Sequence, residues 1–203
     1  MMLAMLKKDC KMEKTTTIGR MVKSSLVAYR QKDMISALIN IMPAIDSTAN
    51  KEYGGGVGFR IKSFFRKDEG LINFIAIGML CLLPSFLYPG KTKAVDFADI
   101  LYDNIRTYIV HTGEVSEIIS FNNNNTFSFG TKWDLNEKHV LAFILCVIIS
   151  EKNANEFIDG DEIINLNFGN FSVNDLWGRH DDLLHHIANN SKGKYKVKNS
   201  KLE

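Results

Sequence analysis

The chain alternates apolar stretches at helical spacing with short polar or glycine-rich breaks. A first apolar stripe recurs every three or four residues and comprises Met34, Leu38, Ile41 and Ile45. This spacing predicts a helix that is capped by Asp33 and is kinked or ended at Pro43. We interpret residues 54–58 (GGGVG), which follow, as a flexible hinge.

The longest uncharged stretch runs over residues 71–88 and has the minimum length of a membrane span. Asn73 and Gly78 interrupt it, and Pro84 is expected to end a helix near Leu83. The remaining run of about 13 residues is nearer the length of a buried core helix. We therefore expect residues 71–83 to be buried in a helical bundle, with a membrane span as the alternative.

A well-delimited helix is predicted from Asp96 to His111. Asp96 is a typical N-cap, and Gly113 suits the left-handed position just past the end of a helix. Its apolar face consists of Phe97, Ile100, Leu101, Ile105, Tyr108 and Ile109.

Residues 117–121 and 126–130 resemble two short strands, and Asn122–Asn125 would form the turn of a hairpin between them. A buried helix is expected over 135–150, strand character over 162–173 and an amphipathic helix over 174–190. The sequence thus predicts a mainly α fold, a helical bundle with a small β-hairpin appendage. We expect a polar lead over 1–17, one domain over 18–190 and a basic tail over 191–203.

The 203 residues carry 25 basic and 23 acidic side chains, a balance too even to indicate a nucleic-acid partner by itself. The three cysteines lie far apart without a CxxC pair, which excludes a recognisable disulfide framework or zinc knuckle. No signal-peptide core is readable at the N-terminus, so a cytoplasmic setting is expected.

One short motif bears on function. Arg106 and His111 form Arg-x4-His at the end of the Asp96 helix, with Thr107 after the arginine and two apolar residues before the histidine. This arrangement resembles the HEPN superfamily of small helical bundles, many of which are metal-independent RNases of toxin–antitoxin, abortive-infection and other defence systems. The resemblance covers about 20 residues. In toxins that pair with a nucleotidyltransferase antitoxin a tyrosine stands at the position of Gly113, so that particular partnership is not indicated.

The chemistry of the pair is consistent with RNA cleavage. Imidazole titrates near neutrality, so His111 can transfer protons, and the helix C-terminus favours its charged, acid form. Arg106 can hold a scissile phosphate bidentately. The supporting residues implied around the pair are Asp103, Asn104, Thr107 and Glu114.

Helix geometry places Arg106 and His111 about 140° apart around an ideal helix, so the two side chains do not share one face. A two-fold homodimer would let both pairs line one cleft, as the resemblance also implies. The structural alternative is that Arg106 forms a surface ion pair with Asp103 or Asp99 while His111 caps its helix.

Two weaker patterns also have simpler explanations. Arg60, Lys62 and Arg66 lie among phenylalanines and could contact RNA, although a core-facing aromatic stripe with solvated charges explains the pattern better. On the last helix, Asp181/His185 and Asp182/His186 have a spacing compatible with metal binding, but no further ligands are evident, so no metal or other cofactor is predicted.

The sequence therefore predicts a metal-independent endoribonuclease of a defence or toxin–antitoxin system, with antiviral defence as one setting. Its expected partners are an RNA substrate, a second copy of the chain and an antitoxin protein. Association with a membrane is not expected. The alternative is a catalytically silent helical module that binds RNA or a protein.

Overall fold

The computed structural model describes residues 15–87, 92–124 and 126–190. Its helices are α1 (Thr17–Arg30), α2 (Met34–Glu52), α3 (Val57–Ile77), α4 (Phe97–Leu101), the π-helical turn η1 (Tyr102–Arg106), α5 (Thr107–Thr112), α6 (Lys138–Ile149), the 3₁₀ turn η2 (Glu151–Asn153), α7 (Val173–Leu176) and α8 (His180–Asn190). The strands form three two-stranded sheets, β1 (Phe86–Leu87) with β2 (Ala94–Val95), β3 (Ile119–Asn122) with β4 (Trp133–Asn136), and β5 (Ile163–Leu166) with β6 (Gly169–Ser172). The predicted mainly helical fold with small β elements is confirmed.

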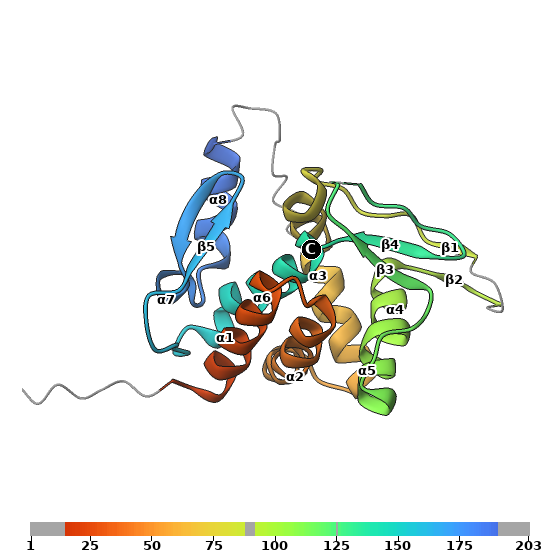
Figure 1. The fold of residues 1–203 in the computed structure, drawn as a ribbon, viewed down its shortest axis with the longest axis horizontal. Coiled ribbons are helices and arrows are strands. Elements are labelled where there is room, and N and C mark those ends of the chain that lie inside the picture. The colour runs from red at the N-terminus through yellow and green to blue at the C-terminus, as the bar shows by residue number, and fades with distance from the viewer. Residues whose placement is uncertain (1–14, 88–91, 125, 191–203) are drawn as a thin grey trace, which may run out of the picture.

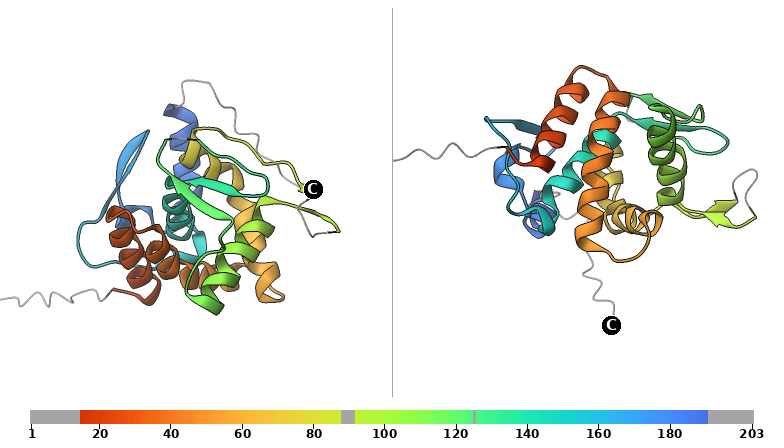
Figure 2. Two further views of the ribbon diagram at one scale, coloured as in Figure 1. Left: turned by 45° about the vertical axis from the view of Figure 1, so that its right-hand side comes forward. Right: turned by 90° about the horizontal axis from the view of Figure 1, so that it is seen from below.

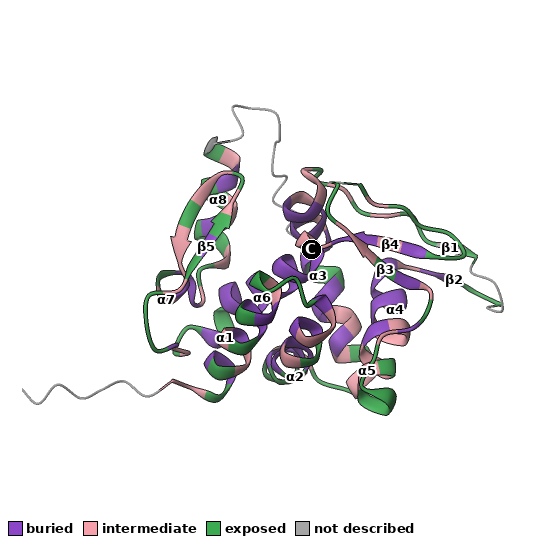
Figure 3. Ribbon diagram, viewed as in Figure 1, coloured by how far each residue is buried: buried purple, intermediate pink, exposed green. Residues whose placement is uncertain are grey.

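The core of the fold is the apolar helix α6, in which every residue from His139 to Ile149 is buried. Helices α1, α2 and α3 pack against it. Figure 1 shows α4 and α5 beside α3 on one side of this bundle and α8 with the β5–β6 hairpin on the other, and Figure 2 gives the same arrangement from two more directions. In Figure 3 the buried residues concentrate on the inward faces of the bundle helices.

The helix predicted from the apolar stripe that begins at Met34 is confirmed as α2, and Asp33 is its N-cap. It runs through Pro43 to Glu52 rather than ending there. The residues before a proline can stay helical when tertiary packing outweighs the lost hydrogen bond. Pro43 itself is exposed, so its ring lies on the outer face of the helix.

The uncharged stretch beginning at Leu71 behaves differently in its two halves. Residues 71–77 complete α3, and Leu71, Ile72 and Ile75 are buried as expected. The helix ends at Gly78, which has a φ of 76°, six residues earlier than the predicted stop at Pro84. Met79, Leu80 and Leu82 are exposed, so burial of the whole run to Leu83 was a wrong prediction. Among the described residues, no helix combines the length and apolarity required to cross a bilayer.

The predicted hairpin over 117–130 is wrong. Strand β3 pairs in parallel with β4, and Ile119 lies opposite Trp133. Phe127 and Phe129 instead pack against Trp133, whose ring also stacks on Phe97 at 5.8 Å between centroids. Burial of Trp133 and Phe97, against which the partly buried Phe127 packs, explains the changed pairing, because large aromatic side chains dominate core energetics. The predicted turn also includes Asn125, which lies outside the described residues.

The C-terminal region is more broken than predicted. The strand character over 162–173 is confirmed as the β5–β6 hairpin, whereas the expected helix from 174 is split into α7 and α8. Gly178 separates them with a φ of 75°. A Cβ there would lie 2.5 Å from the Ala154 Cβ, so this close approach requires glycine.

A pair between His180 and the buried carboxylate of Asp68 connects α8 to the bundle. The His180 Nε2 lies 2.8 Å from the Asp68 Oδ1 on α3, and Asp68 is only 5% exposed. The hydrogen bond from the imidazole to Asp68 raises the pKa of His180, against the opposing effect of burial.

Replacing His180 by alanine should destabilise the fold by about 1–3 kcal/mol, because Asp68 loses its hydrogen-bond donor. Since the folded pKa exceeds the unfolded value, this stabilisation is complete below the unfolded pKa and declines as the pH rises through the folded pKa. Urea unfolding at pH 5.5 to 9, with the exposed His185→Ala as control, measures it. An equal loss of stability at every pH would contradict the charged pair.

Candidate functional site

The Arg-x4-His motif lies on one continuous helical element made of α4, η1 and α5. Asp96 and Asp99 form a capping box at its start, in which each side chain accepts a hydrogen bond from the backbone N–H of the other residue. Gly113 ends it in the left-handed conformation, with a φ of 76°. Both predicted ends of this helix are confirmed.

The middle of this helix is a π-helical turn, which the sequence analysis did not predict. It spans Tyr102–Arg106, and the Thr107 hydroxyl donates to the Tyr102 carbonyl at 3.0 Å. Single π-turns inside α-helices occur frequently at functional sites. The π-turn ends at Arg106. It is therefore a structural indication of a functional role for Arg106 that does not depend on the resemblance of the motif to HEPN proteins.

Arg106 points toward α2 rather than along its own helix. Its Nη2 lies 3.5 Å from the Asp46 Oδ2, and its guanidinium lies 5.7 Å from the centroid of the Tyr102 ring. Its side chain is 19% exposed and makes no hydrogen bond to any described residue. The alternative of a surface ion pair is thus realised, but with Asp46 instead of the predicted Asp103 or Asp99.

A second arginine approaches the same carboxylate. The Arg60 Nη2 lies 3.9 Å from the Asp46 Oδ1, while its Nη1 donates to the Gly55 carbonyl at 2.6 Å. The Nε of Arg60 is buried and has no hydrogen-bond partner among the described residues. One carboxylate therefore stands between two guanidinium groups that retain unused N–H donors, which leaves a net positive site suited to an anion.

A surface cavity of about 360 Å³ opens beside this group. It is lined by Pro43, Asp46, Ser47, Asn50 and Arg60. All but Arg60 come from one face of α2, so the helix contributes small polar groups and the arginine contributes charge. This shallow and open shape is compatible with a polymeric substrate that lies across the surface.

Tyr102 lies between two cations. The Lys62 Nζ is 5.1 Å from the ring centroid, on a face of α3 that also carries Gly58. A Cβ at Gly58 would lie 3.3 Å from the Tyr102 ring, so this glycine permits close packing of α3 on η1. The tyrosine therefore fixes the position of Arg106 relative to α3.

His111 occupies the last turn of α5 and is exposed. Its side chain makes no hydrogen bond or ion pair with any described residue. The residues that follow Arg106, Thr107–Thr112, form the α-helix α5, so the expected separation of about 140° between Arg106 and His111 persists. Helix geometry within one chain thus leaves the two side chains on different faces.

The other predicted site residues have mainly local roles in the described structure. Asn104 donates to the Ile100 carbonyl at 3.2 Å, and Asp103 and Thr107 lie on the same helix, partly buried. Glu114 is exposed after the helix end.

The two remaining cations of the predicted RNA-binding cluster are paired with acidic residues. Lys62 lies 2.8 Å from Asp99, and Arg66 lies 2.6 Å from Asp96. Although burial opposes ionisation, the hydrogen bond from Lys62 helps to hold the pKa of Asp99 below its ordinary value. The core-facing interpretation of the nearby rings is confirmed for Phe64 and Phe65 and is wrong for Phe59, which is 62% exposed.

Sequence reasoning missed Asp46, Ser47 and Asn50. Their signal was a polar group at i, i+1 and i+4, next to buried positions such as Ile45 and Ala49. Without the tertiary structure, such a group resembles any solvated helix face. Among the described residues, no group of three histidine, cysteine, aspartate or glutamate side chains could hold a metal ion.

A family model described as Rv1289 matches residues 17–202. No curated protein and no solved structure matches the chain. The matched range begins at the first residue of α1 and includes Asp46, Arg60, Arg106 and His111.

Proposed function

The chain belongs to the Rv1289 family, and from the site around Arg106 we propose that it is a metal-independent endoribonuclease that acts as a homodimer in a defence or toxin–antitoxin system. The observation that carries this proposal is the guanidinium of Arg106. It is held on a π-helical turn, its ion-pair partner Asp46 lines an open cavity, and its N–H donors make no hydrogen bond to described residues. The proposal also draws on the resemblance of the Arg106 and His111 pair to the HEPN motif.

In the proposed reaction the RNA 2′-oxygen attacks the adjacent phosphorus. The bond from phosphorus to the 2′-oxygen forms and the bond to the 5′-oxygen breaks, which leaves a 2′,3′-cyclic phosphate and a free 5′-hydroxyl. One His111 accepts the 2′-hydroxyl proton, and His111 of the second subunit donates a proton to the leaving 5′-oxygen. Arg106 stabilises the charge that develops on the phosphorane oxygens.

The surface of α5 supports a dimer. None of its residues is buried within one chain, and Tyr108 and Val110 are 42% and 58% exposed. Figure 3 shows this helix in green and pink only, at the edge of the bundle. Exposed apolar side chains beside His111 would be covered if two α5 helices met across a two-fold axis.

The dimer is tested by the variant Val110→Glu, which places a charge in the proposed interface. We expect the unmodified protein to have the mass of a dimer at micromolar concentration in light scattering, and Val110→Glu to be a monomer. The matched control is Val27→Glu, another exposed valine on a helix, 42% exposed on α1, which should remain a dimer. A monomeric unmodified protein would contradict the shared cleft.

The activity is tested by incubating the purified protein with total RNA in the presence of EDTA. Cleavage that persists and leaves 2′,3′-cyclic phosphate ends supports the proposal, whereas cleavage that requires a divalent metal overturns it.

A second candidate is the catalytically silent module that binds RNA or a protein. The ion pair between Arg106 and Asp46 favours this second candidate, because an ion-paired arginine can stabilise the fold without taking part in a reaction. Binding of RNA by the unmodified protein without any cleavage would make this the better description.

A further inference from the structure

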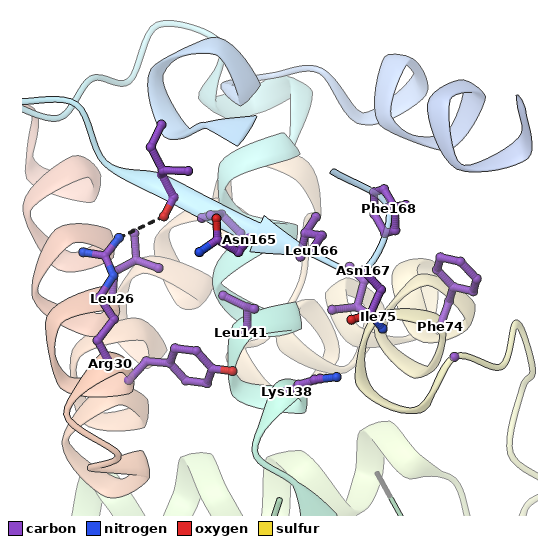
Figure 4. A pocket seen from close by; sticks show the side chains of 14 residues that line it. Leu26, Arg30, Phe74, Ile75, Lys138, Leu141, Asn165, Leu166, Asn167 and Phe168 are labelled. Atoms are coloured by element: carbon purple, nitrogen blue, oxygen red, sulfur yellow. Dashed lines mark hydrogen bonds between the residues drawn. The ribbon is translucent and has the colours of Figure 1, made fainter. Parts of the chain in front are cut away.

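A second cavity, which shares no residue with the site around Arg106, lies between the bundle and the β5–β6 hairpin. Its volume is about 180 Å³. Figure 4 shows that α1, α3 and α6 supply its walls and that the hairpin covers it. The apolar part of its lining consists of Leu26, Phe74, Ile75, Leu141, Ile164, Leu166 and Phe168.

The size of the cavity limits the ligand. An apolar cavity of about 150 Å³ holds one benzene molecule. The cavity described here therefore accommodates an apolar group of about six to eight carbon atoms. A ligand of drug size would require the hairpin to move.

Two cationic side chains line the cavity. Arg30 and Lys138 both line it, and none of its lining residues is an aspartate or a glutamate. Arg30 is held in place by Glu162 and by the Ile163 carbonyl, to which its Nη2 donates at 3.0 Å. Lys138 lies one helical turn from Leu141 on α6, so its cation stands next to the apolar wall (Figure 4).

Tyr29 adds a hydrogen-bond donor. Its hydroxyl makes no hydrogen bond to any described residue, although the side chain lines the cavity and is partly buried. Burial, and secondarily the charge of Glu137, raise the pKa of Tyr29, so the phenol remains a donor at neutral pH. A polar group that lines a cavity and has no partner in the protein is one that a ligand can satisfy.

We propose that this cavity binds a small monocarboxylate, with its apolar part against Leu141 and Ile75 and its carboxylate between Lys138 and Tyr29. The apolar wall disfavours a fully polar anion such as phosphate, and the cation of Lys138 disfavours a cationic amphiphile. A carboxylate with a short hydrocarbon body satisfies both conditions.

Isothermal titration calorimetry with octanoate, 1-octanol and octylamine on the full chain tests the proposal. We expect octanoate to bind one saturable site and to raise the melting temperature, octanol to bind more weakly and octylamine not to bind. Failure of octanoate to saturate at millimolar concentration overturns the proposal, and equal binding of octanol and octanoate overturns the role of the carboxylate.

Two variants locate the site. Lys138→Met keeps the aliphatic stem and should weaken octanoate binding at least tenfold, the usual effect of losing one charge-assisted hydrogen bond. Tyr29→Phe removes only the hydroxyl and should weaken it about threefold, while the exposed Lys132→Met should leave it unchanged. If Lys138→Met fails to fold, Lys138→Gln takes its place. Unchanged affinity in both cavity variants overturns the assigned site.

Discussion

Replacing His111 by alanine is expected to lower the rate of RNA cleavage by about 10² to 10⁴-fold, the contribution typical of a general acid–base group. His111 is exposed and makes no hydrogen bond or ion pair with described residues, so its removal should leave the fold intact. The measurement is the initial rate of cleavage of a labelled RNA with EDTA present, together with the melting temperature. The matched control is His185→Ala, which also removes an exposed histidine from a helix.

The arginine provides the second arm of this experiment. Arg106→Lys keeps the charge but loses the planar fork that holds a phosphate through two N–H groups, so it should be nearly as inactive as His111→Ala. Arg66→Lys, at an arginine already paired with Asp96 and Asp99, is the control and should remain active. Full activity in His111→Ala and Arg106→Lys, with both proteins folded, would remove these residues from the reaction.

The ends of the Asp96 helix could be predicted because local chemistry determines them. The Asp96 side chain accepts a hydrogen bond from the backbone N–H of Asp99, an arrangement typical of the first turn of a helix. Gly113 adopts a positive φ, which most other residue types disfavour. The π-turn between them could not be predicted. It depends on the Thr107 hydroxyl reaching the Tyr102 carbonyl and on Tyr102 packing against α3 at Gly58.

The prediction of the strand pairing was wrong for a related reason. Alternating residues over 117–130 indicate strand conformation but do not identify the partner strand. The partner of Ile119 is Trp133, and this choice follows from an aromatic cluster whose members come from separate segments of the chain. Single-sequence patterns contain no information on such contacts.

The candidate site was predicted in part. The motif identified Arg106 and His111, but Asp46 lies 60 positions before Arg106 and belongs to another helix. A partially buried arginine needs a counterion, yet the sequence offers many acidic residues. Asp99 and Asp103 are the partners expected from the sequence because they lie on the same helix as Arg106. The fold instead brings Asp46 of α2 to Arg106.

The aromatic cluster also contains a titratable group, His139, at the start of α6. It is fully buried among Phe97, Phe127 and the nearby rings, and its Nδ1 lies 3.0 Å from the Asn136 carbonyl. Its Nε2 has no hydrogen-bond partner among the described residues. Burial lowers the pKa of His139 from 6.5 to about 4, so the folded protein keeps this imidazole neutral where the unfolded chain would protonate it.

Acid should therefore destabilise the protein through His139. Above about pH 6.5 the group is neutral in both states and contributes nothing, and as the pH falls toward 4 only the unfolded chain takes up the proton. The pKa difference corresponds to about 3 kcal/mol, fully expressed below the folded pKa.

Urea unfolding of the unmodified protein and of His139→Phe between pH 7.5 and 4 measures this loss of stability. The carboxylates titrate in both proteins, so the difference between the two curves isolates His139. The unmodified protein should lose about 3 kcal/mol more than the variant, and parallel curves would show that the buried imidazole is protonated in the folded state.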